Sequence, residues 1–245
     1  GAIWHFQRTL LYPGWSYPPE YSSQIPPEAE RWTIDTADGK TDAIYLRSTR
    51  ASKPAPAVIF FHGNGEFAED AIAYVQHYRD FGYHVLIPEY RGFGGSTGEP
   101  GQGVIVEDVL LFIEKLKKRK EVDAAAIIYH GQSLGGGVAT AVSSLQPPRA
   151  LILESTFASV RELASRFLAP GILVKDPFNT IEALKELNVP ILVMHGTMDP
   201  VIPVDHSRRN HATARHSKLW ITKAQHRIFQ SDEYSSPMRP AQAFS

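Results

Sequence analysis

The sequence predicts an α/β fold in which a mostly parallel, doubly wound sheet follows an antiparallel hairpin near the amino terminus. From residue 57 onward, short apolar runs alternate with segments whose apolar residues follow helical spacing. Before them, RWTIDT and DAIYLRS alternate in polarity on either side of Asp38-Gly39, a pair typical of hairpin turns. A hairpin followed by β-α repeats places helices on both faces of one sheet.

Six apolar runs give the expected strands, and the segments between them give the helices. In chain order the runs are AVIFFHG, YHVLIPEY, AAIIYHG, ALILEST, PILVMHG and KLWITKA. Apolar residues three or four positions apart predict helices within residues 67–78, 105–116, 160–168 and 181–187. The second of these ends at the basic run KLKKRK, which we interpret as a solvated helix end because cations complement the helix dipole there.

We expect residues 1–245 to form a single domain. A chain of 245 residues with 43% hydrophobic content can bury a substantial core in one body. The first thirty residues contain five prolines and many aromatics, which disfavour a helix and predict an ordered arm over residues 1–30. Residues 169–180, APGILVKDPFNT, carry no helical pattern and predict a short lid segment.

Composition and charge narrow the classes of partner. The net charge of -1 gives no global electrostatic attraction to nucleic acid, so we expect a small-molecule or lipid-like partner. The absence of cysteine removes disulfides, thiolate nucleophiles and cysteine zinc sites. His206, His211 and His216 recur every five residues, which is not helical metal spacing, so no metal site is expected.

The compartment and the oligomeric state stay open at this stage. No apolar run approaches the roughly 18 residues of a membrane span, and no secretory leader is visible at the start. Cytoplasmic, periplasmic and membrane-associated locations therefore all remain alternatives. Membrane association would need a segment that is absent from this chain.

A serine stands between glycines in GQSLG, residues 131–135, which fits the pattern G-x-S-x-G. An apolar run precedes it and GGGVATAVSSL follows it, so the serine is expected at a sharp strand-to-helix turn. Side chains in place of Gly131 and Gly135 would crowd that turn. The turn would expose the hydroxyl of Ser133 and present the NH of Leu134 at a helix amino terminus, where it can stabilise an oxyanion.

A serine becomes a good nucleophile only when a base removes its proton, so the hypothesis requires a histidine and an acid at later strand ends. Asp199 follows the apolar run PILVMHG, and His226 follows the last run. Alone, an aspartate before proline can simply build a turn, and a histidine can simply lie at the surface. Their places after the expected strands select these two residues.

The segment FFHGNGE is expected to supply the second oxyanion donor. Gly63 and Gly65 let the chain fold tightly after a strand, and the NH of Asn64 would then point toward the reacting carbonyl. We interpret His62, at the end of the same strand, as a structural hydrogen-bonding residue. Glu89 and Arg91 are interpreted as parts of a structural turn.

The segments HGNG, EYRGFGGSTGEP, GQSLGG, LILESTF and VMHGTMDPVIP occur in the order typical of α/β-hydrolases. The chain resembles that superfamily over residues 32–230, and within it the small serine hydrolases of the depalmitoylase-like and serine-aminopeptidase-like group. The resemblance implies a triad of Ser133, Asp199 and His226, with the amides of Asn64 and Leu134 as the oxyanion hole. It also implies hydrolysis of esters or thioesters.

The leading hypothesis is a serine hydrolase that cleaves carboxylic esters or thioesters through an acyl-enzyme on Ser133, with no cofactor and no metal. One alternative is a peptidase or amidase, because the same triad can cleave amides. The other is a binding protein that kept the fold and lost activity. Within the lid segment, the apolar Ile172, Leu173, Val174 and Phe178 could form an acyl pocket or pack into the core.

Overall fold

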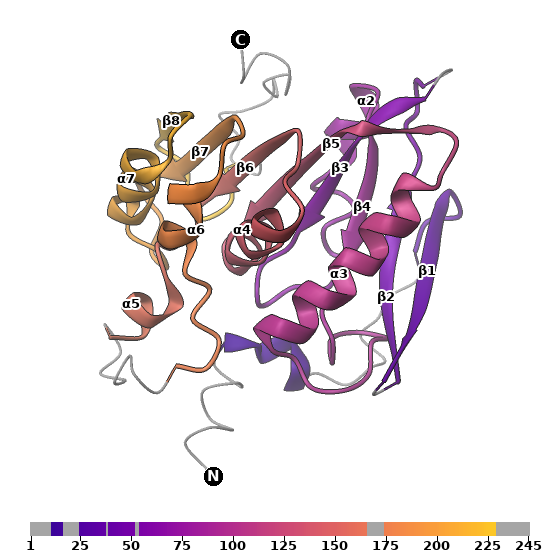
Figure 1. Cartoon of the computed structure of the whole chain (residues 1–245), viewed down its shortest axis with the longest axis horizontal. Helices are drawn as coiled ribbons and strands as arrows, with labels where there is room; N and C mark the ends of the chain where they lie inside the picture. The colour runs from indigo at the N-terminus through magenta and orange to yellow at the C-terminus, as the bar shows by residue number, and fades with distance from the viewer. Residues whose placement is uncertain (1–10, 17–24, 38, 52–53, 166–173, 229–245) are drawn as a thin grey trace. The chain divides into compact units, whose positions relative to one another are not determined.

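The computed structural model describes residues 11–16, 25–37, 39–51, 54–165 and 174–228 (Figure 1). The chain divides into a first unit, Gly1–Ile127, and a second unit, Ile128–Ser245, and the single domain over residues 1–245 stays a prediction. Most of the predicted arm lies outside the described residues, apart from the short 3-10 helix η1 (Pro13–Ser16) and the segment that leads into the first strand. Across the described ranges, no helix is both long and apolar enough to cross a membrane.

The first unit begins with the predicted hairpin. Its strands are β1 (Ala29–Thr36), β2 (Gly39–Leu46), β3 (Ala55–Phe61) and β4 (His84–Pro88). They lie in the order β1-β2-β4-β3, with β2 antiparallel to both β1 and β4, and with β3 parallel to β4. Gly39 starts β2 with φ of +130°, a backbone conformation that favours glycine.

The helices of the first unit agree only partly with the sequence pattern. Helix α3 (Gln102–Lys117) covers the predicted range 105–116 and buries its apolar stripe. Helix α2 is confined to Gln76–Asp80, although apolar spacing predicted a helix from residue 67. Residues 68–75 form turns instead. The Asp70 NH donates to the Phe67 carbonyl at 3.0 Å and the Ile72 NH to the Glu69 carbonyl at 3.2 Å, so these bonds span three residues and not the four of an α-helix.

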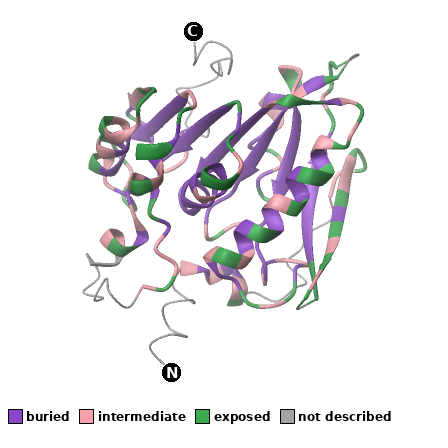
Figure 2. Ribbon diagram, viewed as in Figure 1, coloured by how far each residue is buried: buried purple, intermediate pink, exposed green. Residues whose placement is uncertain are grey.

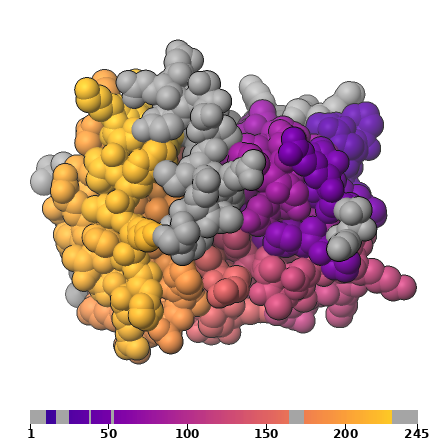
Figure 3. Space-filling view, turned by 90° about the horizontal axis from the view of Figure 1, so that it is seen from above, coloured from indigo at the N-terminus to yellow at the C-terminus, as the bar shows by residue number. Residues whose placement is uncertain are grey.

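The second unit contains the remaining parallel strands. Strand β5 (Val122–Gln132) starts in the first unit and ends in the second, followed by β6 (Ala150–Glu154), β7 (Ile191–Gly196) and β8 (Ser217–Thr222). Each strand pairs in parallel with the next, in the order β5-β6-β7-β8. Figure 3 shows the last described segments of this unit, coloured orange and yellow, gathered together on one face.

Within the described part of this unit, the helices are α4 (Leu134–Leu145), α5 (Val160–Ser165), α6 (Thr180–Glu186) and α7 (Val204–Thr213). Helix α4 packs on β6 and α6, and α7 packs on β7 and β8. Every residue of β6 and of β7 is buried (Figure 2). Burial on both faces explains why these strands read as continuous apolar runs and not as alternating ones.

These observations confirm the predicted fold class, a mostly parallel sheet with antiparallel pairing at its start and helices around it. The carboxyl ends of β5, β6 and β7 therefore meet at one edge of the second unit's sheet. Function in such sheets is found at that edge.

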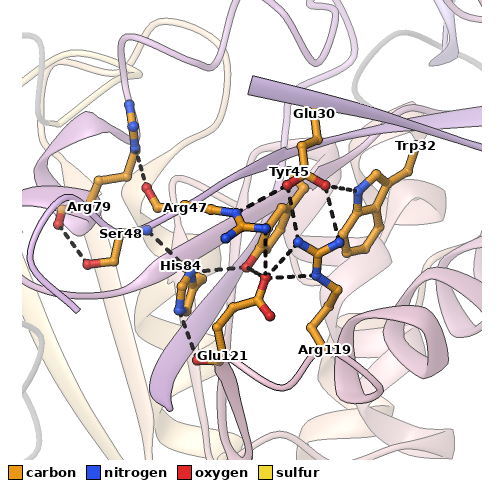
Figure 4. Close-up of polar contacts among 9 residues, drawn as sticks. All are labelled: Glu30, Trp32, Tyr45, Arg47, Ser48, Arg79, His84, Arg119 and Glu121. Atoms are coloured by element: carbon orange, nitrogen blue, oxygen red, sulfur yellow. Dashed lines mark hydrogen bonds and ion pairs between the residues drawn. The ribbon is translucent and has the colours of Figure 1, made fainter. Parts of the chain in front are cut away.

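A cluster of charged and aromatic side chains joins the hairpin to the residues that follow α3 (Figure 4). Trp32 stacks on Tyr45 with ring centroids 4.7 Å apart, and the Arg119 guanidinium lies 5.1 Å from the Tyr45 ring centroid. Arg119 also bonds Glu30 at 3.1 Å and Glu121. Because these ion pairs are partly exposed, each contributes only about 0–1 kcal/mol, and the stacked rings are the more important part of the cluster.

His84 is a buried histidine of this cluster. Its Nδ1 accepts the Ser48 NH at 3.2 Å and lies 3.0 Å from the Tyr45 hydroxyl, while its Nε2 lies 3.0 Å from the Glu121 carbonyl oxygen (Figure 4). A ring nitrogen that accepts a backbone NH carries no proton, so the geometry selects the neutral imidazole. Burial is the largest influence and lowers the pKa of His84 below its ordinary value of 6.5.

Acidification should therefore destabilise the first unit through His84. As pH falls through 6.5, the unfolded chain takes up the His84 proton before the folded chain does, so the free energy of unfolding decreases. His84→Gln cannot titrate, and its unfolding free energy should fall less steeply between about pH 7 and pH 5. Urea unfolding of both proteins across this range measures the difference, with the exposed His216→Gln as the control for loss of a histidine. Parallel curves for wild type and His84→Gln would contradict the assignment.

Candidate active site

Ser133 lies at the junction of β5 and α4, in the strand-to-helix turn expected from the sequence. The turn was expected to expose its hydroxyl, but Ser133 is buried and only 8% exposed. Its backbone has φ of 55° and ψ of -120°, which is strained for a residue with a side chain. Hydrogen bonds on both sides hold this conformation: the Ser133 NH donates to the Glu154 carbonyl at 2.9 Å, and the Thr156 hydroxyl donates to the Ser133 carbonyl at 2.7 Å. The elbow is thus fixed by β6 and not by the helix alone.

Gly131 is required by a close approach of backbone to backbone. A Cβ atom at this position would lie 2.3 Å from the carbonyl oxygen of Gly135 and 2.6 Å from Cα of Gly136. Gly136 in turn faces the Thr156 side chain, where a Cβ would lie 2.4 Å from Oγ1. These contacts give the physical reason for the glycines around the serine, because the turn cannot close with larger residues.

The two predicted oxyanion donors lie in different units. Leu134 is the first residue of α4, and an NH in the first turn of a helix has no acceptor within the helix. Asn64 lies in the first unit, between the buried Gly63 and the exposed Gly65, and is itself half-buried. The use of both amides as an oxyanion hole stays a prediction.

Asp199 and His226 are brought together by the loops that follow β7 and β8. Nδ1 of His226 donates to Oδ2 of Asp199 at 2.7 Å. The Asp199 side chain is 1% exposed, whereas the His226 side chain is 24% exposed. The Asp199 carboxylate is therefore shielded from water. It bonds Nδ1 of the partly exposed His226 and not Nε2.

Several donors hold Asp199 in its ionised form. Burial alone would raise the pKa of this carboxyl, but hydrogen bonds from His195, His226 and the Ile202 NH outweigh it and hold the pKa well below its ordinary range. Nε2 of His195 lies 3.2 Å from Asp199 Oδ2, and the Val201 NH donates to Oδ1 at 2.8 Å. An ionised Asp199 keeps the proton of His226 on Nδ1, which leaves Nε2 as the basic nitrogen.

Backbone hydrogen bonds join the segment that follows β7 to the end of β8 and the loop after it. The Thr197 NH donates to the Thr222 carbonyl at 2.8 Å, and the Met198 NH donates to the Ala224 carbonyl at 3.1 Å. A Cβ at Gly196 would lie 2.1 Å from the same Ala224 oxygen, so only glycine fits there. These contacts hold the loop of Asp199 next to the loop of His226.

Within the second unit's described residues, the Ser133 hydroxyl makes no hydrogen bond to His226. The structure thus joins the predicted acid to the predicted base and places the serine at its own elbow. Catalytic hydrogen bonds are often long without a ligand and shorten when substrate binds. The complete triad accordingly stays a prediction.

The remaining candidates have structural contacts. In the first unit, His62 is fully buried, with its Nε2 3.0 Å from Glu89 Oε1 and its Nδ1 2.9 Å from the Gly63 carbonyl. Glu89 also accepts the NH groups of Ala68 and Tyr90, and Arg91 bonds Asp108.

The predicted acyl pocket is described only at its end. Ile172 and Leu173 lie outside the described residues, together with the rest of the lid segment before residue 174. Val174 is half-buried, and Phe178 is 1% exposed with φ of 34°. Phe178 packs so close to α4 that a Cβ at Gly137 would lie 2.9 Å from it. A role for these four residues in acyl binding stays a prediction.

Sequence reasoning missed His195. It lies inside a buried strand, where its Nδ1 is 2.6 Å from the Ser207 hydroxyl and its Nε2 is 2.8 Å from the Ile202 carbonyl. A histidine inside an apolar run needs hydrogen-bonding partners, and that requirement was the available signal.

Comparison with known proteins gives relatives across most of the chain. A protein of Mycobacterium tuberculosis, Rv2307c, is 31% identical over 226 residues, which cover 89% of this chain and 79% of the relative. Protein bem46 of Schizosaccharomyces pombe is 28% identical over 221 residues, and the match covers 83% of this chain and 73% of bem46.

Solved structures share the fold at low sequence identity. An acylaminoacyl peptidase from Pyrococcus horikoshii superposes with a TM-score of 0.69 at 17% identity, and this chain, matched over 83% of its residues, spans only 38% of that peptidase chain. Est1E from Butyrivibrio proteoclasticus, in a complex with ferulic acid, superposes with a TM-score of 0.68 at 19% identity, covering 80% of this chain and 90% of Est1E.

A family model described as serine aminopeptidase S33 matches residues 52–175, just over half of the chain. The match spans the HGNG segment, the GQSLG elbow and strand β6. Together with the fold, it shows that the chain belongs to the serine aminopeptidase S33 family of α/β-hydrolases.

Proposed function

We propose that this hydrolase cleaves carboxylic esters or thioesters of small-molecule or lipid-like substrates through an acyl-enzyme on Ser133. The observation that carries the proposal is the 2.7 Å bond between His226 Nδ1 and the buried Asp199, in the same unit as the strained Ser133 elbow. A dry carboxylate that fixes the tautomer of a partly exposed imidazole is the arrangement that a serine nucleophile requires.

In the proposed reaction, Nε2 of His226 takes the proton of Ser133 as Oγ attacks the substrate carbonyl. The oxyanion is stabilised by the NH of Leu134 at the start of α4 and by the NH of Asn64. The imidazolium then protonates the leaving group, and an acyl ester remains on Ser133. A water molecule, deprotonated by His226, attacks this ester and releases the acid.

A second candidate is a peptidase or amidase, since the matching family is described as serine aminopeptidase and a fold neighbour is an acylaminoacyl peptidase. That neighbour is far longer, because this chain spans 38% of it. Est1E shares the fold without such extra length, since the match covers 90% of its chain.

Ser133→Ala should abolish hydrolysis while preserving the fold, because the side chain caps no helix NH and alanine removes only its hydroxyl group. The measurement is hydrolysis of 4-nitrophenyl acetate together with covalent labelling by a fluorophosphonate. Wild type should be labelled at Ser133 and the variant should not be labelled. A folded Ser133→Ala protein that turns over the ester at more than a trace of the wild-type rate would contradict the proposal.

The ester assignment predicts that an ester is cleaved faster than an amide with the same acyl group. An amide is stabilised by resonance and its leaving nitrogen must be protonated, so kcat/KM for 4-nitrophenyl acetate should exceed that for 4-nitroacetanilide by roughly tenfold or more. Aminoacyl 4-nitroanilides and an acyl thioester complete the panel. Faster cleavage of an aminoacyl anilide than of any ester would favour the peptidase candidate.

A further inference from the structure

Glu154 is a buried carboxylate that the proposed reaction does not use. It ends β6, and its side chain has no exposure to solvent. Burying a carboxylate is unfavourable unless hydrogen bonds replace the lost water. Its bonding partners therefore indicate why this position in an otherwise apolar run is charged.

The carboxylate of Glu154 holds the loop that carries His226. Its Oε1 accepts the NH of Ile228 at 2.8 Å, and Ile228 is two residues beyond His226. Its Oε2 lies 3.0 Å from Nε2 of His130, a histidine of β5 that is also fully buried. The loop after β8 is thereby tied to β5 and β6.

The backbone of Glu154 holds the nucleophile. Its carbonyl oxygen accepts the NH of Ser133 at 2.9 Å. His130 precedes Ser133 by three residues on the strand that leads into the elbow, and Gln132 pairs in register with Glu154. One residue is therefore bonded to the main chain of the serine and, through its side chain, to the loop of the base.

This double attachment restricts where His226 can lie. Two residues of extended chain reach at most roughly 7 Å, so fixing the Ile228 NH confines the histidine to a small region. Displacing a catalytic group by about 1 Å can reduce turnover by roughly 100-fold. The contact of Glu154 with Ile228 is thus in a position to decide whether Nε2 of His226 reaches the serine hydroxyl.

We propose that Glu154 is a positioning residue that holds the His226 loop in register with Ser133. The inference rests on the proposed function and adds a residue to it. Glu154 touches neither substrate nor reacting atoms, and it acts through the Ile228 NH.

Three substitutions separate the reach of this side chain from its charge. E154Q keeps the Oε1 acceptor for Ile228 and loses the charge. E154D keeps the charge, but it is one methylene shorter and cannot reach both Ile228 and His130. E154L removes both acceptors. The readouts are kcat and KM for 4-nitrophenyl acetate, the rate of fluorophosphonate labelling, and Tm.

The proposal predicts an order of activities. E154L should lower kcat by roughly 100-fold with KM changed by less than about threefold, because geometry is lost and ground-state binding is not. E154Q should retain kcat within about fivefold of wild type, and E154D should fall well below E154Q. If E154L does not fold, the comparison of E154Q with E154D still decides. An E154D variant as active as wild type, or more active than E154Q, would overturn the proposal.

A double-mutant cycle with His226→Ala tests whether Glu154 acts through the histidine. In that background E154L, or E154D, should slow fluorophosphonate labelling by less than about twofold, since there is no base left to position. If E154L slows labelling as much in the His226→Ala background as in wild type, Glu154 does not act through His226, and the proposal is overturned. D108N, which weakens a buried ion pair with Arg91 in the first unit, controls for loss of a buried charge and should lower Tm while leaving kcat within about twofold.

Failure of this inference is distinguishable from failure of the proposed function. Labelling of wild type at Ser133, and its loss in Ser133→Ala, tests the nucleophile without reference to Glu154. If that labelling holds and E154L retains wild-type kcat, only the positioning role of Glu154 is wrong.

Discussion

The backbone conformation of Ser133 is the constraint on which the second unit depends. A φ of 55° at a residue with a side chain is unfavourable by about 1–3 kcal/mol, so the surroundings must impose it. They do so through the absence of side chains at Gly131 and Gly136, through the bond from the Ser133 NH to the Glu154 carbonyl of β6, and through the Thr156 hydroxyl, which donates to the Ser133 carbonyl. The strand next to β5 supplies the acceptor, because the carbonyl of Glu154 at the carboxyl end of β6 accepts the serine NH.

The positions of Asp199 and His226 also depend on contacts between neighbouring strand ends. Asp199 is ionised because His195, His226 and the Ile202 NH donate to it, and these donors come from β7 and the two loops beyond it. Gly196 allows the loop after β8 to cross within van der Waals distance. A fold with parallel strands brings such loops to one edge, which is why residues far apart in sequence can form one site.

Much of this could be predicted from the sequence where a local rule applies. The elbow at Ser133 was predicted because its tight turn admits only glycine at Gly131. The buried strands were predicted because burial on both faces requires continuous apolar runs. The helix start predicted at residue 67 was wrong, because residues 68–75 form turns with backbone bonds that span three residues, and apolar spacing does not distinguish such turns from an α-helix. His195 was missed because its partners, the Ile202 carbonyl and the Ser207 hydroxyl, lie in the loop and helix that follow β7, and apolar periodicity does not register such contacts. Glu154 was missed because its partners, His130 on β5 and Ile228 beyond β8, are far away in the sequence.

In the proposed reaction, an acyl group is transferred to Ser133 before water releases it. Rapid quenching of the reaction with a slowly hydrolysed 4-nitrophenyl ester, followed by peptide mass mapping, measures that intermediate directly. The acyl mass should appear on the peptide that contains Ser133, and it should form as fast as the first equivalent of nitrophenol. Cleavage of the ester with the acyl group on another residue, or on none, would contradict it.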